Sequence, residues 1–138
     1  GDGLSCEITE GPWRLAADMP AKAGGEETAP TPGVLGRAAL ASCLVIGIAT
    51  WSARLGIPID DLAVEVHADF DARGELGAED GVRPGYTAIR YEITIDSPAP
   101  RERLIELLDL AERHSPYLDV FGNPMALSGR HRLNGQDV

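Results

Sequence analysis

Cys43 is the residue of this chain whose surroundings best fit chemistry. It lies near the middle of an apolar segment, and its neighbours along one helical face are small residues, namely Gly36, Ala39, Gly47 and Thr50. Small side chains let a substrate or another backbone come close to a thiol. The pattern therefore predicts either a nucleophile, which reacts as a thiolate, or a small apolar core residue, since free cysteines are often buried.

The other polar groups fit a reaction or a metal less well. One predicted strand face carries four carboxylate and imidazole groups: Glu65, His67, Asp69 and Asp71. They could bind a metal, but the alternation is typical of a solvated strand face. His114 precedes Ser115, yet adjacent residues on a helix point in different directions. We therefore expect no metal and no cofactor.

Composition excludes several classes of partner. The 138 residues include 12 Lys+Arg and 22 Asp+Glu, which gives a net charge of -10. This charge argues against non-specific binding to nucleic acid and against docking on an anionic membrane. The longest uncharged stretch, residues 38–53, is shorter than the ~20 residues of a membrane span. With only two cysteines, we expect a cytoplasmic protein with reduced thiols and a single domain over residues 1–138.

The apolar periodicity predicts the elements that must position Cys43. Strands are expected over residues 4–8, 13–18, 62–70 and 86–95, and helices over residues 33–55 and 101–114. Residues 19–32 are expected to form a loop, residues 117–121 a short helical turn, and residues 125–133 a last strand. This order predicts an α+β fold in which the two long strands form an antiparallel pair.

The first predicted helix is apolar on almost every side. Its large apolar residues are Val34, Leu35, Leu40, Leu44, Val45, Ile46, Ile48 and Trp51. A helix that is apolar all round must be buried all round, and the few other predicted elements are not enough to surround it. We therefore predict that a second copy of the chain completes its burial in a symmetric homodimer.

Several motifs together resemble one family. They are Asp18-Met19-Pro20, Gly24-Gly25, Pro30-Thr31-Pro32, Ala41-Ser42-Cys43 and residues 111–116, Ala-Glu-Arg-His-Ser-Pro. Their order and spacing resemble the OsmC/Ohr superfamily of osmotically inducible and organic hydroperoxide resistance proteins, and most of all its broader OsmC-like branch. The resemblance implies an intertwined homodimer with antiparallel sheets around a long central helix.

The resemblance also implies thiol peroxidase chemistry. In typical members the helix cysteine, here Cys43, attacks an organic hydroperoxide and becomes a sulfenic acid, which a second cysteine resolves. This chain has Ser115 at the second position, and Gly33 where hydroperoxide resistance members have a glutamate that positions an arginine. Arg14 and Arg37 are the candidates for that arginine, and each is otherwise an ordinary surface or interface cation.

Two functions remain open from the sequence. The first is reduction of organic hydroperoxides through Cys43, with a small thiol or a dithiol protein as reductant and Arg14 or Arg37 stabilising the thiolate. Cys6 is a further candidate resolver, or else a core residue. The alternative is a non-catalytic dimer that binds a small apolar ligand, which the departures at Ser115 and Gly33 favour.

Overall fold

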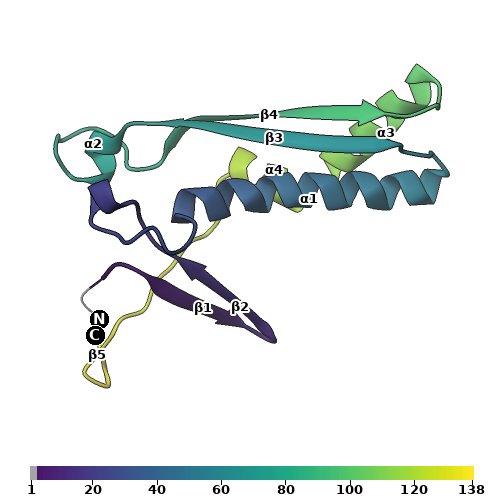
Figure 1. The fold of residues 1–138 in the computed structure, drawn as a ribbon. Helices are drawn as coiled ribbons and strands as arrows, with labels where there is room; N and C mark the ends of the chain where they lie inside the picture. Colours follow the sequence, from purple (N-terminus) through teal and green to yellow (C-terminus); the bar gives the residue numbers. More distant parts are fainter. Residues whose placement is uncertain (1–2) are drawn as a thin grey trace.

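The structure is a computed structural model that describes residues 3–138. The first two residues of the expected single domain lie outside this range. A long helix, α1, runs through the centre, with strands β3 and β4 over one side and helices α3 and α4 beside it (Figure 1). The fold is α+β, as predicted.

Helix α1 spans Pro32–Leu55 and has clear start and stop signals. The Thr31 hydroxyl accepts a hydrogen bond from the Val34 amide at 3.2 Å, and Pro32 occupies the first turn, where no backbone donor is needed. Gly56 ends the helix with a φ of 67°, a left-handed conformation that glycine adopts at little cost. The predicted helix over residues 33–55 is therefore confirmed.

Strands β3 (Asp61–Phe70) and β4 (Tyr86–Asp96) form the predicted antiparallel pair, with Val66 opposite Tyr91. Their half-buried side chains alternate with exposed ones, and Leu62, Ile93 and Ile95 pack on the core. The connection between the strands contains a short helix, α2 (Ala72–Glu75), that the apolar periodicity does not predict.

The core lies where α1 meets helix α3 (Arg101–Arg113). Its fully buried members are Ile48, Ile57, Leu107 and Ala111. The Tyr91 hydroxyl donates a hydrogen bond to the Glu112 carboxylate and so ties β4 to α3. Helix α4 (Pro116–Gly122) follows directly and contacts α1 near its middle.

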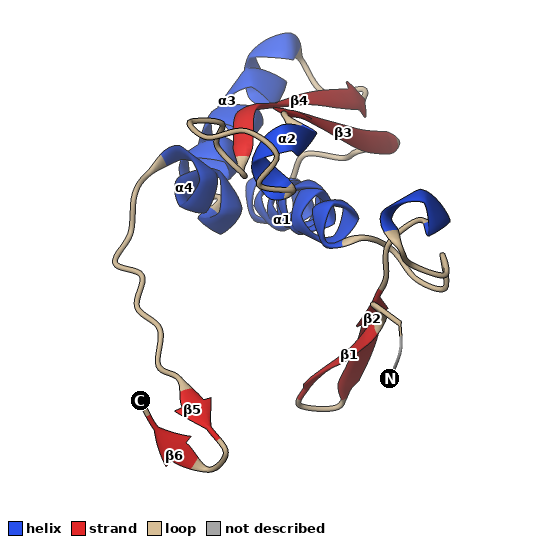
Figure 2. Cartoon of the chain, turned by 90° about the vertical axis from the view of Figure 1, so that its left-hand side faces the viewer, coloured by secondary structure: helices blue, strands red, loops and turns tan. Residues whose placement is uncertain are grey.

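The chain ends form two hairpins that project from the side of α1 away from β3 and β4 (Figure 2). The first pairs β1 (Cys6–Glu10) with β2 (Trp13–Ala17), and the second pairs β5 (Arg132–Leu133) with β6 (Gln136–Asp137). The predicted strand over residues 125–133 is wrong for most of its length. Asn134 and Gly135 both have positive φ and form a tight hairpin turn, so the short strands lie on either side of it.

The loop between β2 and α1 is organised by Asp18, and it includes a 3-10 turn, η1 (Ala21–Ala23). The buried Asp18 carboxylate accepts hydrogen bonds from the amides of Met19, Glu26 and Thr28 and from the Thr28 hydroxyl, the last at 2.6 Å. The Thr28 hydroxyl and these amides lower the pKa of Asp18 to about 2. A Cβ atom on Gly25 would lie 1.9 Å from the Met19 carbonyl oxygen, so only glycine fits there.

A single chain leaves much of α1 uncovered. The helix buries one face, formed by Leu40, Leu44, Ile48 and Ser52, whereas Ile46 is 67% exposed. The expectation that α1 is buried all round is therefore not met within one chain. The accessible surface is 10261 Å², whereas a compact monomer of 14.6 kDa exposes about 6,900 Å².

By length and composition alone, α1 could also cross a membrane. The core helix of a soluble protein passes the same test, and α1 packs against β3, α3 and α4. It also carries Arg37 and Arg54 near its two ends. We therefore interpret α1 as a core helix that one copy of the chain covers only in part.

Candidate functional site

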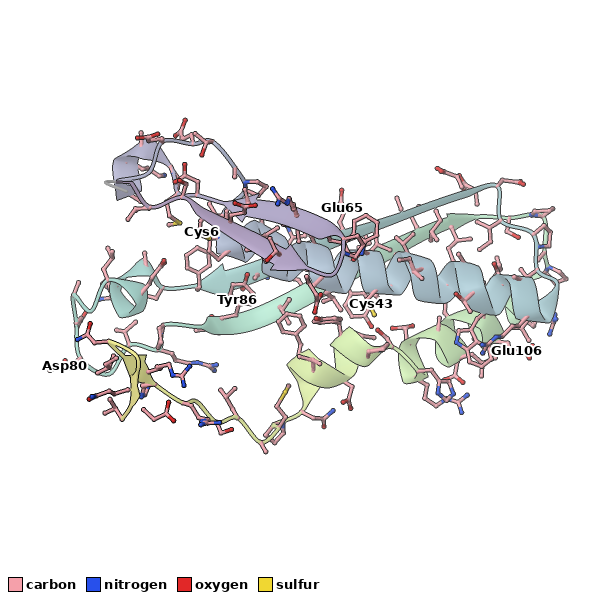
Figure 3. The ribbon with its side chains drawn as sticks, turned by 90° about the horizontal axis from the view of Figure 1, so that it is seen from below. Cys6, Cys43, Glu65, Asp80, Tyr86 and Glu106 are labelled. Carbon is pink, nitrogen blue, oxygen red and sulfur yellow. The ribbon has the colours of Figure 1, made fainter. Side chains whose placement is uncertain are left out.

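The thiol of Cys43 faces the start of α4. Its sulfur lies 3.6 Å from the hydroxyl oxygen of Ser115, and the thiol is half-buried. Ser115 is buried and is the N-cap of α4, where its hydroxyl accepts a hydrogen bond from the Leu118 amide at 3.4 Å. Figure 3 shows Cys43 at the edge of α1 next to α4. The structure therefore places the side chain of Ser115 beside the thiol of Cys43.

An open, mostly apolar pocket of about 480 Å³ adjoins the sulfur. It is lined by Ala39, Ser42, Cys43, Ile46, Gly47, Pro116 and Tyr117. The small side chains on this face of α1 leave space beside the thiol. Tyr117 also lines the pocket, and the centre of its ring lies 6.4 Å from the centre of the Phe121 ring. The pocket can accept a small apolar molecule next to the thiol.

Arg37 points away from Cys43. The two residues are six positions apart, which places them about 120° apart around the helix axis. The Arg37 guanidinium donates a hydrogen bond to the Tyr86 hydroxyl at 3.2 Å, and Tyr86 in turn donates to the Gly33 carbonyl at 3.3 Å. Tyr86 thus holds Arg37 at the start of α1, next to Gly33.

Arg14 lies on the β1–β2 hairpin, in solvent. Its side chain is 80% exposed and forms an ion pair with Glu7 at 3.4 Å. Among residues 3–138, no hydrogen bond or ion pair joins Arg14 or Arg37 to Cys43. The structure therefore brings Cys43 together with Ser115 and with neither candidate arginine.

Cys6 and Glu27, a residue of the loop before α1, form no hydrogen bond with the Cys43 thiol among residues 3–138. Cys6 is exposed on β1, and Figure 3 shows it well separated from Cys43. Glu27 accepts a hydrogen bond from the Ala21 amide at 3.2 Å, within the loop itself.

The acidic face of β3 is solvated. His67 lies 3.6 Å from the Glu65 carboxylate, and Asp69 forms an ion pair with Arg90 at 2.9 Å. In the part of the chain that the structure describes, no group of three or more metal-ligating side chains could hold an ion. These charges therefore pair with their neighbours along the sheet.

Sequence reasoning missed Tyr86, which orients Arg37. No local signal marked it, because its place beside α1 depends on the pairing of β4 with β3. The Tyr86 ring also lies 6.2 Å from that of Phe70, across the same strand pair. Tertiary contacts of this kind leave no periodic trace in a sequence.

Comparisons with known proteins agree with the observed fold. The family model of OsmC-like proteins matches residues 24–128. An OsmC-like protein from Mycoplasma pneumoniae has a similar structure, with 17% identity over 86% of this chain and 79% of that one and a TM-score of 0.71. No curated protein matches the sequence.

Two further similar structures are of proteins described as hydroperoxide resistance proteins. An OsmC-like hydroperoxide resistance protein from Jannaschia sp. CCS1 is 18% identical over 97% of this chain and 93% of its own, with a TM-score of 0.63. An organic hydroperoxide resistance protein OsmC from Legionella pneumophila is 18% identical over 86% and 87%, with a TM-score of 0.59. At these identities the likeness shows the fold, and the family match goes further: the chain belongs to the OsmC-like protein family.

Proposed function

We propose that this protein reduces organic hydroperoxides through Cys43. The observation that carries the proposal is a half-buried thiol on the floor of an open apolar pocket, with a buried hydroxyl 3.6 Å away. Membership of the OsmC-like family and the hydroperoxide resistance named for two structural neighbours support it.

The reaction follows from the chemistry of a thiolate. The Cys43 thiolate attacks the peroxide oxygen that carries the hydrogen, so an S–O bond forms while the O–O bond breaks. The departing alkoxide becomes an alcohol by taking up from solvent the proton that the thiol released on ionising. The peroxide gains two electrons, and the sulfur becomes a sulfenic acid. The apolar lining of the pocket favours hydroperoxides with alkyl or aryl groups.

An external thiol completes the cycle in this proposal, because Ser115 cannot form a disulfide. One thiol attacks the sulfenic sulfur, which releases water and leaves a mixed disulfide on Cys43. A second thiol then releases Cys43 and forms the disulfide of the reductant. Two thiols are thus oxidised for each hydroperoxide reduced. We place this cycle in the cytoplasm, where small thiols stay reduced.

The proposal includes a homodimer formed across the uncovered side of α1. The surface of one chain exceeds that of a compact monomer by about 3,400 Å², which is enough for the interface of an obligate dimer. Both terminal hairpins project on that side of α1 (Figure 2). Arg14 on the first hairpin, which one chain leaves in solvent, would then be available to the thiol of the second copy.

The direct test is turnover of cumene hydroperoxide with dithiothreitol as the thiol. We expect peroxide loss that depends on the added thiol, a gain of one oxygen atom on Cys43 when the thiol is withheld, and no turnover in Cys43→Ser. The matched control is Cys6→Ser, which should turn over like the unchanged protein, because Cys6 lies at the open end of its hairpin, opposite Ala17, whereas Arg14 lies near the turn. A protein that leaves the peroxide intact and keeps Cys43 as a thiol refutes the proposal.

A second candidate function is binding of a small apolar ligand without catalysis. The lack of any contact between an arginine and Cys43 in the described chain favours it. In that case Cys43→Ser should bind an apolar dye such as anilinonaphthalene sulfonate as tightly as the unchanged protein. No hydroperoxide would then be consumed by either form.

A further inference from the structure

Ser115 is held firmly at the entrance of α4. It is only 5% exposed, its amide donates to the Glu112 carbonyl at 3.3 Å, and its carbonyl accepts from the Asp119 amide at 3.2 Å. Its hydroxyl oxygen already accepts the Leu118 amide hydrogen at 3.4 Å. The hydroxyl hydrogen of Ser115 therefore still needs a hydrogen-bond acceptor.

Cys43 is the acceptor available to that hydrogen. Across residues 3–138, the Cys43 sulfur is the only side-chain or backbone atom, other than the Leu118 amide, that shares a hydrogen bond with the Ser115 hydroxyl. The 3.6 Å separation fits a hydrogen bond to sulfur, whose radius exceeds that of oxygen.

The charge state of the sulfur decides which atom donates. A thiol can donate weakly or accept, but a thiolate has no hydrogen and can only accept. A serine hydroxyl keeps its hydrogen under conditions in which cysteine ionises. Once Cys43 is a thiolate, the hydrogen bond therefore runs from Ser115 to Cys43, and a hydrogen bond to a charged acceptor is roughly twice as strong as a neutral one.

We propose that Ser115, the residue in place of a second cysteine, donates a hydrogen bond that stabilises the Cys43 thiolate and orients it toward the pocket. This role serves the reaction proposed above, on which its catalytic meaning rests. Within residues 3–138, no arginine forms a hydrogen bond with this sulfur, whereas Ser115 does.

The test compares how the rate of Cys43 alkylation by iodoacetamide depends on pH, in a Cys6→Ser background so that only one thiol reacts. In Ser115→Ala we expect the midpoint of the profile to rise by about one pH unit, which is a tenfold smaller thiolate fraction below the midpoint. Ser115→Thr keeps a hydroxyl at this position and should restore the original midpoint.

Two controls separate the hydrogen bond from the helix cap that Ser115 also provides. Thr31→Ala removes the hydroxyl cap of α1 without a contact to Cys43, so it should lower stability and leave the midpoint unchanged. If Ser115→Ala does not fold, Ser115→Gly replaces it, since glycine is a good N-cap but has no hydroxyl. An unchanged midpoint in the folded hydroxyl-free variant overturns the proposal, and so does a threonine variant that shifts as far as alanine.

A peroxide measurement keeps this proposal distinct from the proposed function. With cumene hydroperoxide, Ser115→Ala should react about threefold more slowly than the unchanged protein near neutral pH, because the greater nucleophilicity of a more basic thiolate offsets part of the tenfold loss in thiolate fraction. The deficit should disappear at alkaline pH, where both thiols are ionised. If the unchanged protein does not react with peroxide but the alkylation midpoint still shifts, the proposed function fails and the Ser115 hydrogen bond stands. If peroxide is reduced and the midpoint does not shift, the reverse holds.

Discussion

The Cys43 sulfur and the Ser115 hydroxyl lie 3.6 Å apart although 72 positions separate them along the chain. Helix α3 and the cap of α4 bring Ser115 back to the middle of α1, where α4 contacts it. Position 115 is thus the place from which a side chain on the same chain reaches the thiol.

Ser115→Cys should convert the protein to one that resolves its own sulfenic acid. A disulfide needs sulfur atoms about 2.05 Å apart, and the side-chain end atoms of residues 43 and 115 already lie 3.6 Å apart. After one equivalent of cumene hydroperoxide, in a Cys6→Ser background, we expect both thiols to be lost and the mass to fall by two hydrogen atoms. Asn123→Cys, beyond the far end of α4, serves as the control and should keep its thiol free.

The hydrogen bond from Tyr91 to Glu112 should make stability fall at alkaline pH. Burial, together with the Glu112 carboxylate, raises the pKa of Tyr91 to about 12 from its usual 10.0. Between these values the unfolded chain loses this proton first, so the free energy of unfolding falls as the pH rises from about 10 to about 12.

Tyr91→Phe removes this bond and its pH dependence. At neutral pH we expect a loss of about 1–2 kcal/mol in the free energy of unfolding, measured by urea denaturation. The difference between the two proteins should shrink above pH 10. A difference that stays constant up to pH 12 would show that the contact does not control ionisation. Tyr117→Phe, on α4, is the control for removal of a tyrosine hydroxyl elsewhere.

Asp18 should act in the opposite pH range. Its pKa, lowered to about 2 from 3.8 by the Thr28 hydroxyl and three amides, means that the folded protein holds this carboxylate in its charged form. The stabilisation is complete above about pH 4 and is lost as the pH falls toward 2, because the unfolded chain takes up the proton first.

Asp18→Asn lacks this charge at every pH. We expect it to be less stable than the unchanged protein at pH 6, by urea denaturation, and to lie closer to it at pH 2.5. Asp61→Asn, whose carboxylate is exposed at the start of β3, provides the control. If Asp18→Asn lowers the free energy of unfolding by the same amount at pH 6 and at pH 2.5, the charged Asp18 carboxylate does not stabilise the loop.

The proposed dimer predicts a strong effect of charge at an exposed position. Ile46 is 67% exposed at the middle of α1, and Ile105 is 53% exposed on α3. In Ile46→Glu, burial of the new carboxylate between two copies should weaken association at least about a hundredfold, seen by light scattering during gel filtration. Ile105→Glu should leave association unchanged. A monomeric unchanged protein, or an Ile46→Glu dimer of normal affinity, would contradict this interface.

Local sequence signals predicted most of the fold. Gly56 marks the end of α1, and the strict alternation along β3 and β4 identifies both strands. The apolar residues before position 134 favoured one longer strand over residues 125–133. The Asn134-Gly135 turn instead fixes where the two short strands β5 and β6 pair. Turn chemistry was the stronger signal there.

The candidate site was less accessible from the sequence. The order of motifs placed Cys43 and Ser115 in corresponding family positions, and the structure puts them in contact. The partner of Arg37 could not be foreseen, because Tyr86 reaches it only through strand pairing. The role of Arg14 stays a prediction, since it depends on a second copy of the chain.

One chain exposes 10261 Å² of accessible surface to water, so the stability of the proposed dimer depends on the concentration of the protein. With the proposed dimer, covering α1 and acquiring the native fold become one event, so mass action governs both. Dilution then acts as a denaturant, and the melting temperature climbs with protein concentration. A cell that makes little of this protein would hold it in a weaker state than a cell that makes much.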